Sequence, residues 1–173
     1  CKTFIGNIEN AKVIILYGNP GLKLGDYRDE HEDEDYINEL DSDLNFTSNG
    51  FLCLREVAKE TGGYNYWNNG NRFKKIIQEY SDKKGVSYSD SHSFIAKNIC
   101  LLESIGYHST KTPILKPTDF ASSIITKELV HNYFLPKARN GEVIIFSWRQ
   151  STFWGLEPES NVIIRNPNAA RHP

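Results

Sequence analysis

The sequence predicts an α/β fold, a three-layer α/β/α sandwich built on a four-stranded, mostly parallel sheet. Four short apolar runs recur along the chain: Val13–Leu16, Ile99–Leu102, Val143–Phe146 and Val162–Ile164. Runs of this kind are typical of strands that are buried on both faces. Segments with helical spacing separate them, which indicates a parallel sheet with helices on both sides. Since no repeat or linker divides the 173 residues, we expect one domain over residues 1–173.

The first apolar run ends abruptly in Gly18-Asn19-Pro20-Gly21. Glycine and proline break regular structure and turn the backbone outward. In open α/β sheets, ligands bind just beyond the carboxyl ends of the strands. Asn19 is therefore well placed to do chemistry, although the same four residues are also compatible with a plain strand followed by a turn.

An acidic segment follows, and we expect an exposed insertion over residues 26–46. Ten acidic residues and one arginine lie between residues 26 and 43, which leaves 19 basic against 12 acidic residues elsewhere. The body of the chain is thus basic by about seven charges, although the whole chain carries −2. A basic body is compatible with binding phosphates and equally with a solvated surface.

Helices are expected between the strands. Helical spacing over residues 51–58 predicts one that ends at Gly62-Gly63, and Phe73–Tyr80 predicts an amphipathic one that ends near Gly85. Residues 64–71, which lie between these two helices, are aromatic and turn-forming. A further helix opens at Pro117-Thr118, and its expected apolar face consists of Phe120, Ile124, Ile125, Leu129 and Phe134.

Each expected strand delivers polar or aromatic residues at its carboxyl end. In strand order these are Asn19, then Glu103 with Tyr107-His108-Ser109, then Trp148-Arg149, then Asn166 and Asn168. The carboxyl ends of parallel strands meet at one edge of a sheet, so the four motifs converge there. Their convergence indicates a site more strongly than any one motif does.

Other features exclude whole classes of protein. Cys1, Cys53 and Cys100 fit neither a disulfide framework nor a zinc or iron–sulfur spacing, and the last two are expected to be buried. No apolar run is long enough to span a bilayer and no secretory leader is visible, so we expect a cytoplasmic protein without a membrane partner. No metal cluster, catalytic Ser-His-Asp set or phosphate-binding glycine loop emerges, and no metal or cofactor is expected.

Four short motifs occur in the same order as in a known enzyme superfamily. They are Gly18-Asn19-Pro20-Gly21, Gly70-Asn71-Arg72-Phe73, Ile144–Trp148 and Asn166-Pro167-Asn168. With them the chain resembles the uracil-DNA glycosylase superfamily, most of all its mismatch-specific thymine/uracil branch. The chain departs from that pattern in its longer acidic segment, in Arg149 replacing a glycine, and in Ala169-Ala170-Arg171, where no leucine-type wedge is recognisable.

The resemblance implies a monofunctional DNA glycosylase, which flips a damaged, mismatched or modified base into a pocket and hydrolyses its N-glycosidic bond. Asn19 would position the attacking water, and Asn166 would contact the sugar or the leaving base. The implied base-binding residues are Tyr17, Gly18, Gly21, Tyr27, Trp67 and Glu103. The implied DNA-backbone contacts are His108, Ser109, Lys111, Arg149, Asn168 and Arg171. The partner would be DNA, either single- or double-stranded, and we expect a monomer.

Glu103 stands where the superfamily can carry an asparagine that reads the uracil edge. A carboxylate accepts a hydrogen bond from an amino group such as cytosine N4 and repels a carbonyl. If Glu103 reads the base, the substrate carries an exocyclic amine; a solvated or salt-bridged strand-end glutamate is the competing interpretation. Arg149 and Arg165 either contact a phosphate or base oxygen, or pair with the acidic segment.

Two other functions fit the same residues. One is a catalytically silent relative that binds nucleic acid or a nucleobase without cleaving it. The other is an unrelated doubly wound domain that uses Asn19-Pro20-Gly21 to bind a nucleotide or a protein. Activity separates the first from an enzyme, and the placement of Asn19 and Asn166 on one or on opposite edges of the sheet separates the second.

Overall fold

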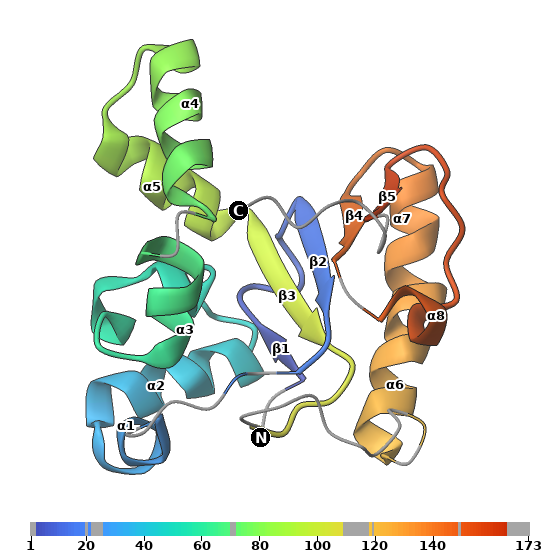
Figure 1. Cartoon of the computed structure of the whole chain (residues 1–173), viewed down its shortest axis with the longest axis horizontal. Helices are drawn as coiled ribbons and strands as arrows, with labels where there is room; N and C mark the ends of the chain where they lie inside the picture. Colours follow the sequence, from blue (N-terminus) through green and yellow to red (C-terminus); the bar gives the residue numbers. More distant parts are fainter. Residues whose placement is uncertain are drawn as a thin grey trace.

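The structure is a computed structural model that describes residues 3–19, 21, 26–69, 72–108, 118, 120–148 and 150–165, without the side chains of residues 27, 29, 30 and 69. The chain forms an α/β fold in which one β-sheet lies between two groups of helices (Figure 1). No helix in the described ranges is both long and apolar enough to cross a membrane.

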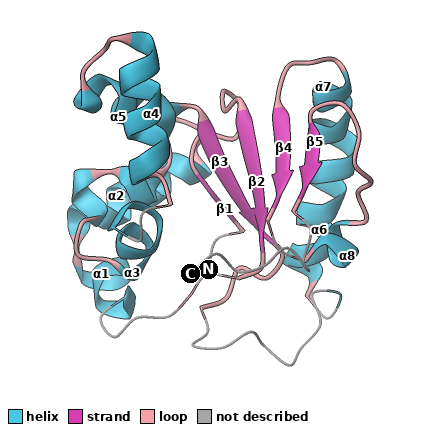
Figure 2. Ribbon diagram, turned by 45° about the horizontal axis from the view of Figure 1, so that its top comes forward, coloured by secondary structure: helices cyan, strands magenta, loops and turns pink. Residues whose placement is uncertain are grey.

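The sheet has five strands in the order β1-β3-β2-β4-β5 (Figure 2). They are β1 Phe4–Ile5, β2 Val13–Tyr17, β3 Ile99–Glu103, β4 Ile144–Ser147 and β5 Val162–Ile164. The last four are the predicted strands and run parallel, whereas β1 pairs antiparallel with β3. The prediction of four strands is therefore corrected to a mixed sheet of five, because a strand of two residues is too short to show a pattern.

The helices lie in the three long connections of the sheet. Between β2 and β3 these are α1 Asp26–Glu32, α2 Glu34–Leu44, η1 Leu52–Leu54, η2 Glu56–Ala58, α3 Gly62–Tyr64, η3 Asn65–Asn69, α4 Lys74–Lys84 and α5 Tyr88–Lys97. Between β3 and β4 they are α6 Ala121–Leu129, η5 Val130–Phe134 and α7 Leu135–Arg139. A short helix, α8 Ser151–Trp154, precedes β5.

Both faces of the sheet are covered by hydrophobic layers. Ile15 and its neighbours pack against the η1 to α5 side, in a layer rich in aromatic rings that we call the aromatic layer. Ile14 and Leu16 pack on the opposite side, against α7, α8 and the turn η5. Burial on both faces explains the continuous apolar sequences of β2 and β3, whereas β4 and β5 each leave one isoleucine, Ile144 and Ile163, exposed.

The helix predictions are confirmed in part. The helix α4 ends at Gly85, whose φ of +65° is the left-handed conformation that favours glycine. Residues 51–58 form two short 3₁₀ turns rather than one helix, and Gly62-Gly63 begins α3 instead of ending a helix, because the hydroxyl of Thr61 caps the amide of Tyr64. The two glycines thus mark the start of a helix rather than the end of one.

The predicted apolar face of α6 and η5 is confirmed at Leu129 and Phe134, which belong to or pack against the core, but it is wrong at Ile124 and Ile125. Ile124 and Ile125 are 46% and 65% exposed, and the buried side chains are Ser123 and Thr126 instead. Thr126 satisfies its hydroxyl by donating to the carbonyl of Ser122 at 2.7 Å. Small or internally bonded polar side chains let a helix pack closely, so the first turns of α6 bury Ser123 and Thr126 where hydrophobicity alone predicts Ile124 and Ile125.

The acidic segment is helical over most of its length. Asp33 caps α2 by accepting from the amide of Tyr36 at 3.0 Å, and Tyr36 itself is buried. Two of its acids, Asp26 and Asp43, are also buried. The segment therefore anchors to the molecule through these buried residues, and its exposed acids include Glu32, Asp33, Glu34, Asp35 and Asp41.

Candidate functional site

The carboxyl ends of the parallel strands bring Tyr17, Glu103 and Trp148 to one edge of the sheet. Tyr17 at the end of β2 lies beside Glu103 at the end of β3 in the sheet register. The amide of Trp148, just after β4, donates to the carbonyl of Leu16 at 2.9 Å. The residues that follow β2, β3 and β4 thus start from one edge of the sheet, as the sequence predicted.

This edge contains a topological switch point between β2 and β4. The chain leaves β2 for helices of the aromatic layer and leaves β4 for α8, whose Trp154 packs in the opposite layer. Connections that diverge to opposite faces leave a crevice beyond the strand ends, and ligands of doubly wound folds bind there. Asn19 follows β2 at this point and is half-buried.

The loop that carries Asn19 is held on both sides. The carbonyl of Gly18 accepts hydrogen bonds from the amide of Ile105 at 2.9 Å and from the hydroxyl of Ser104 at 2.7 Å. Nδ1 of His108 donates to the carbonyl of Gly21 at 2.6 Å. His108, which was predicted to contact the DNA backbone, thus anchors the loop. Gly21 itself has open space around it, since a Cβ atom there would meet no atom within 4 Å.

Aromatic rings line the same edge on one face of the sheet. Tyr17 and Trp67 lie edge to face with their centroids 5.4 Å apart, and the hydroxyl of Tyr17 is hydrogen-bonded to that of Tyr66. The exposed fractions of Tyr17 and Trp67 are only 7% and 5%. These two predicted base-binding residues are therefore packed within the aromatic layer, and Tyr66 and Trp148, which are half-buried, lie closer to solvent.

Glu103 is buried at the end of β3, with 3% of its surface exposed. Strand alternation directs it to the same face as Leu101, which belongs to the aromatic layer. Burial raises the pKa of the nearby Cys53 thiol, and the negative charges of Glu103, Asp43 and Asp26 raise it further. Low exposure excludes the interpretation of Glu103 as a fully solvated strand-end residue.

Three further residues lie at this edge. Ser147 and Arg72 were not candidate site residues, whereas Arg165 was considered as a phosphate or base-oxygen contact or as a partner of the acidic segment. The Ser147 hydroxyl, which is 1% exposed at the end of β4, makes no hydrogen bond within the described part of the chain. Arg72 and Arg165 each stack on an aromatic ring. The sequence held a signal for both arginines, since Arg72 belongs to the Gly-Asn-Arg-Phe motif and Arg165 follows an apolar run.

Several predicted site residues lie outside the residues that the structure describes. They are Asn166, Ser109, Lys111, Arg149, Asn168 and Arg171, together with the side chain of Tyr27. Their roles stay predictions. Over the described ranges, no group of three or more histidine, cysteine, aspartate or glutamate side chains is arranged to hold a metal ion.

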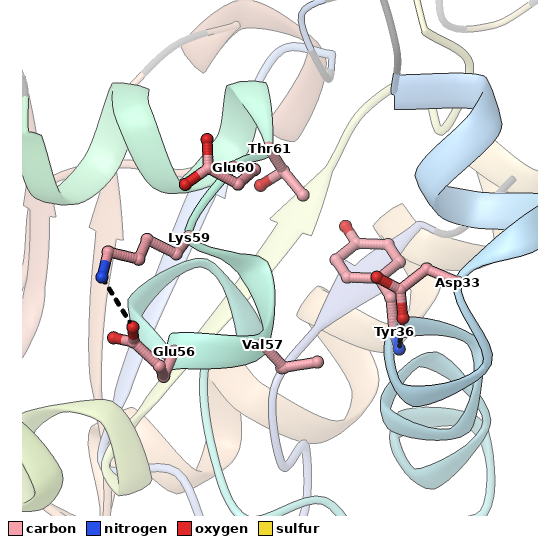
Figure 3. A pocket seen from close by; sticks show the side chains of 7 residues that line it. All are labelled: Asp33, Tyr36, Glu56, Val57, Lys59, Glu60 and Thr61. Carbon is pink, nitrogen blue, oxygen red and sulfur yellow. Dashed lines mark hydrogen bonds and ion pairs between the residues drawn. The ribbon is translucent and has the colours of Figure 1, made fainter.

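A separate hollow of about 210 Å³ lies between the start of α2 and η2 (Figure 3). Its lining residues are Asp33, Tyr36, Glu56, Val57, Lys59, Glu60 and Thr61. Lys59 forms a salt bridge with Glu56, in which Nζ and Oε1 are 2.8 Å apart. No strand end contributes to this hollow, so it is distinct from the edge that carries Asn19.

Comparison of the chain with protein-family models, with curated proteins and with solved structures found no match.

Proposed function

We propose that the protein is a monofunctional DNA glycosylase, which hydrolyses the N-glycosidic bond of a nucleotide flipped into the crevice between β2 and β4. The observation that carries the proposal is the position of Asn19. This half-buried amide follows β2 at the switch point of the sheet, on a loop held through Gly18 and Gly21. The three-layer sandwich of such enzymes is compatible with a mixed five-stranded sheet whose faces are both covered.

The reaction depends mainly on how the protein positions the attacking water and the departing base. The oxygen of a water molecule attacks C1′ through an oxocarbenium-like transition state, the C1′–N bond breaks, and the base leaves with the electron pair and takes up a proton. An asparagine is no strong base, but its carbonyl oxygen can accept from the water and orient it. Fixed donors, such as backbone amides of the loop, stabilise the departing base anion.

Glu103 supports a substrate base with an exocyclic amine. Its carboxylate is buried beside Tyr17, where it is shielded from water. A buried carboxylate that faces a base accepts a hydrogen bond from an amino group and is repelled by a carbonyl oxygen. Cytosine, a modified cytosine or adenine fits this rule, whereas uracil and thymine do not.

The test is base release from oligonucleotides that each carry one candidate base. We expect release of an amino-bearing base and little or no release of uracil, measured by alkaline cleavage at the abasic site. Efficient release of uracil without release of any amino-bearing base would contradict the proposal that Glu103 binds an exocyclic amine. Binding without any release would favour the catalytically silent alternative.

A further inference from the structure

A continuous row of three aromatic rings with an arginine at each end crosses this edge of the molecule. Arg72 lies over the ring of Tyr66, with its Cζ atom 3.4 Å from the ring centroid. The centroids of Tyr66 and Trp67 are 5.0 Å apart, and those of Trp67 and Trp148 are 6.3 Å apart. Arg165 lies over Trp148 at 5.1 Å. The row therefore runs from the start of α4 to the end of β5.

Neither arginine has a carboxylate partner among the residues that the structure describes. Arg72 donates to the backbone carbonyl of Tyr66 at 2.7 Å, and no hydrogen bond of the Arg165 guanidinium is found over the described ranges. Arg139, in contrast, is paired with Glu159 at 3.0 Å. Since a guanidinium has five N–H donors, most of those at Arg72 and Arg165 are left unused by the residues that the structure describes.

Both arginines are also held in place next to the proposed site. Tyr66, under Arg72, is hydrogen-bonded through its hydroxyl to Tyr17, the last residue of β2. The amide of Arg165 donates to the carbonyl of Ser147 at 3.0 Å, which fixes it at the carboxyl end of β4. Stacking on a ring restricts the guanidinium plane, so less side-chain entropy is lost when a ligand binds.

We infer that Arg72 and Arg165 bind phosphates of the DNA strand on either side of the nucleotide that enters the crevice. The inference rests on the proposed function, which supplies the strand. A planar guanidinium matches the two oxygens of a phosphate and binds them in bidentate fashion. Two such groups, neither paired with an acid in the described part of the chain, lie at the ends of one row of rings and provide two fixed positive charges for a phosphodiester backbone.

The test is the salt dependence of binding to a fluorescein-labelled single-stranded oligonucleotide, followed by fluorescence anisotropy. On single-stranded DNA each phosphate contact contributes about 0.7 to the slope of log K against log salt concentration. Arg72→Gln and Arg165→Gln should each lower the magnitude of that slope by about 0.7, and the double variant should lower it by about 1.4. Arg139→Gln, which removes a paired arginine near the amino ends of β4 and β5, should leave the slope unchanged.

Arg72→Lys separates the charge from the packing. It keeps the positive charge and loses the planar stack on Tyr66, so its slope should return close to that of the wild type. If the wild-type protein binds the oligonucleotide and releases a base, but the glutamine variants have the same slope as the wild type, the inference is overturned and the proposed function stands. Failure of the wild-type protein to bind any oligonucleotide would overturn both.

Discussion

Gly50 lies against the carboxyl end of α5 in a backbone conformation that side chains do not tolerate. Its φ is +124°, and a Cβ atom there would lie 2.4 Å from the carbonyl oxygen of Ala96. The same carbonyl accepts from the amide of Phe51, a fully buried residue, at 2.8 Å. The close approach of these two segments therefore fixes where Phe51 enters the aromatic layer.

Replacing Gly50 by alanine should destabilise the protein by about 2–3 kcal/mol, because the new methyl group adds a backbone clash to the strain of positive φ. Urea denaturation measures the loss. Gly85→Ala is the matched control, since Gly85 also has a positive φ of +65° but open space around it, and it should cost about 1 kcal/mol. Equal losses in the two variants would contradict the steric account.

Individual site residues differ in how far the sequence predicted them. Asn19 and Glu103 were predicted because an apolar run marks each strand end, and strand ends are where polar residues meet. Ser147 was not predicted because only the fold shows that its hydroxyl is buried and has no hydrogen-bond partner among the described residues. Arg72 lay within a recognised motif, but its role depends on the ring of Tyr66 beneath it.

The elements show a similar division. Buried parallel strands have uninterrupted apolar sequences, so β2 to β5 were all predicted, whereas the two residues of β1 carry no pattern. The helical acidic segment was expected as an exposed insertion because charge masked its spacing. In α2 the buried side chains are Tyr36 and Asp43, and one of the two is an acid. Hydrophobicity alone does not reveal such a helix.

Asp33→Ala should loosen α2, because the cap that accepts from the amide of Tyr36 is lost. Loss of an N-cap costs about 1 kcal/mol, which corresponds to about fivefold faster hydrogen exchange of the α2 amides if the helix opens locally. Asp33→Asn keeps a capping oxygen and removes only the charge, so it should exchange at the wild-type rate. Equal acceleration in both variants would mean that charge, not capping, holds the helix.

At the scale of the whole molecule, the order of the strands creates the candidate site. The step from β2 to β3 crosses one face of the sheet and the step from β3 to β4 crosses the other, so the loops after β2 and β4 diverge at adjacent strands. Asn19, Trp148 and the two stacked arginines then meet at one edge. Each of these side chains taken singly is explained by an ordinary structural role. The proposed function depends on their meeting at one edge of the sheet.

The most direct test of the central claim is a paired measurement on Asn19→Ala of base release and of DNA affinity. If Asn19 orients the attacking water, release should fall by about 10²–10³-fold, a loss typical of removing one group that acts in the transition state, while affinity stays unchanged. Asn98→Ala, a half-buried asparagine at the amino end of β3, should retain both. Release by Asn19→Ala at the wild-type rate would contradict the account.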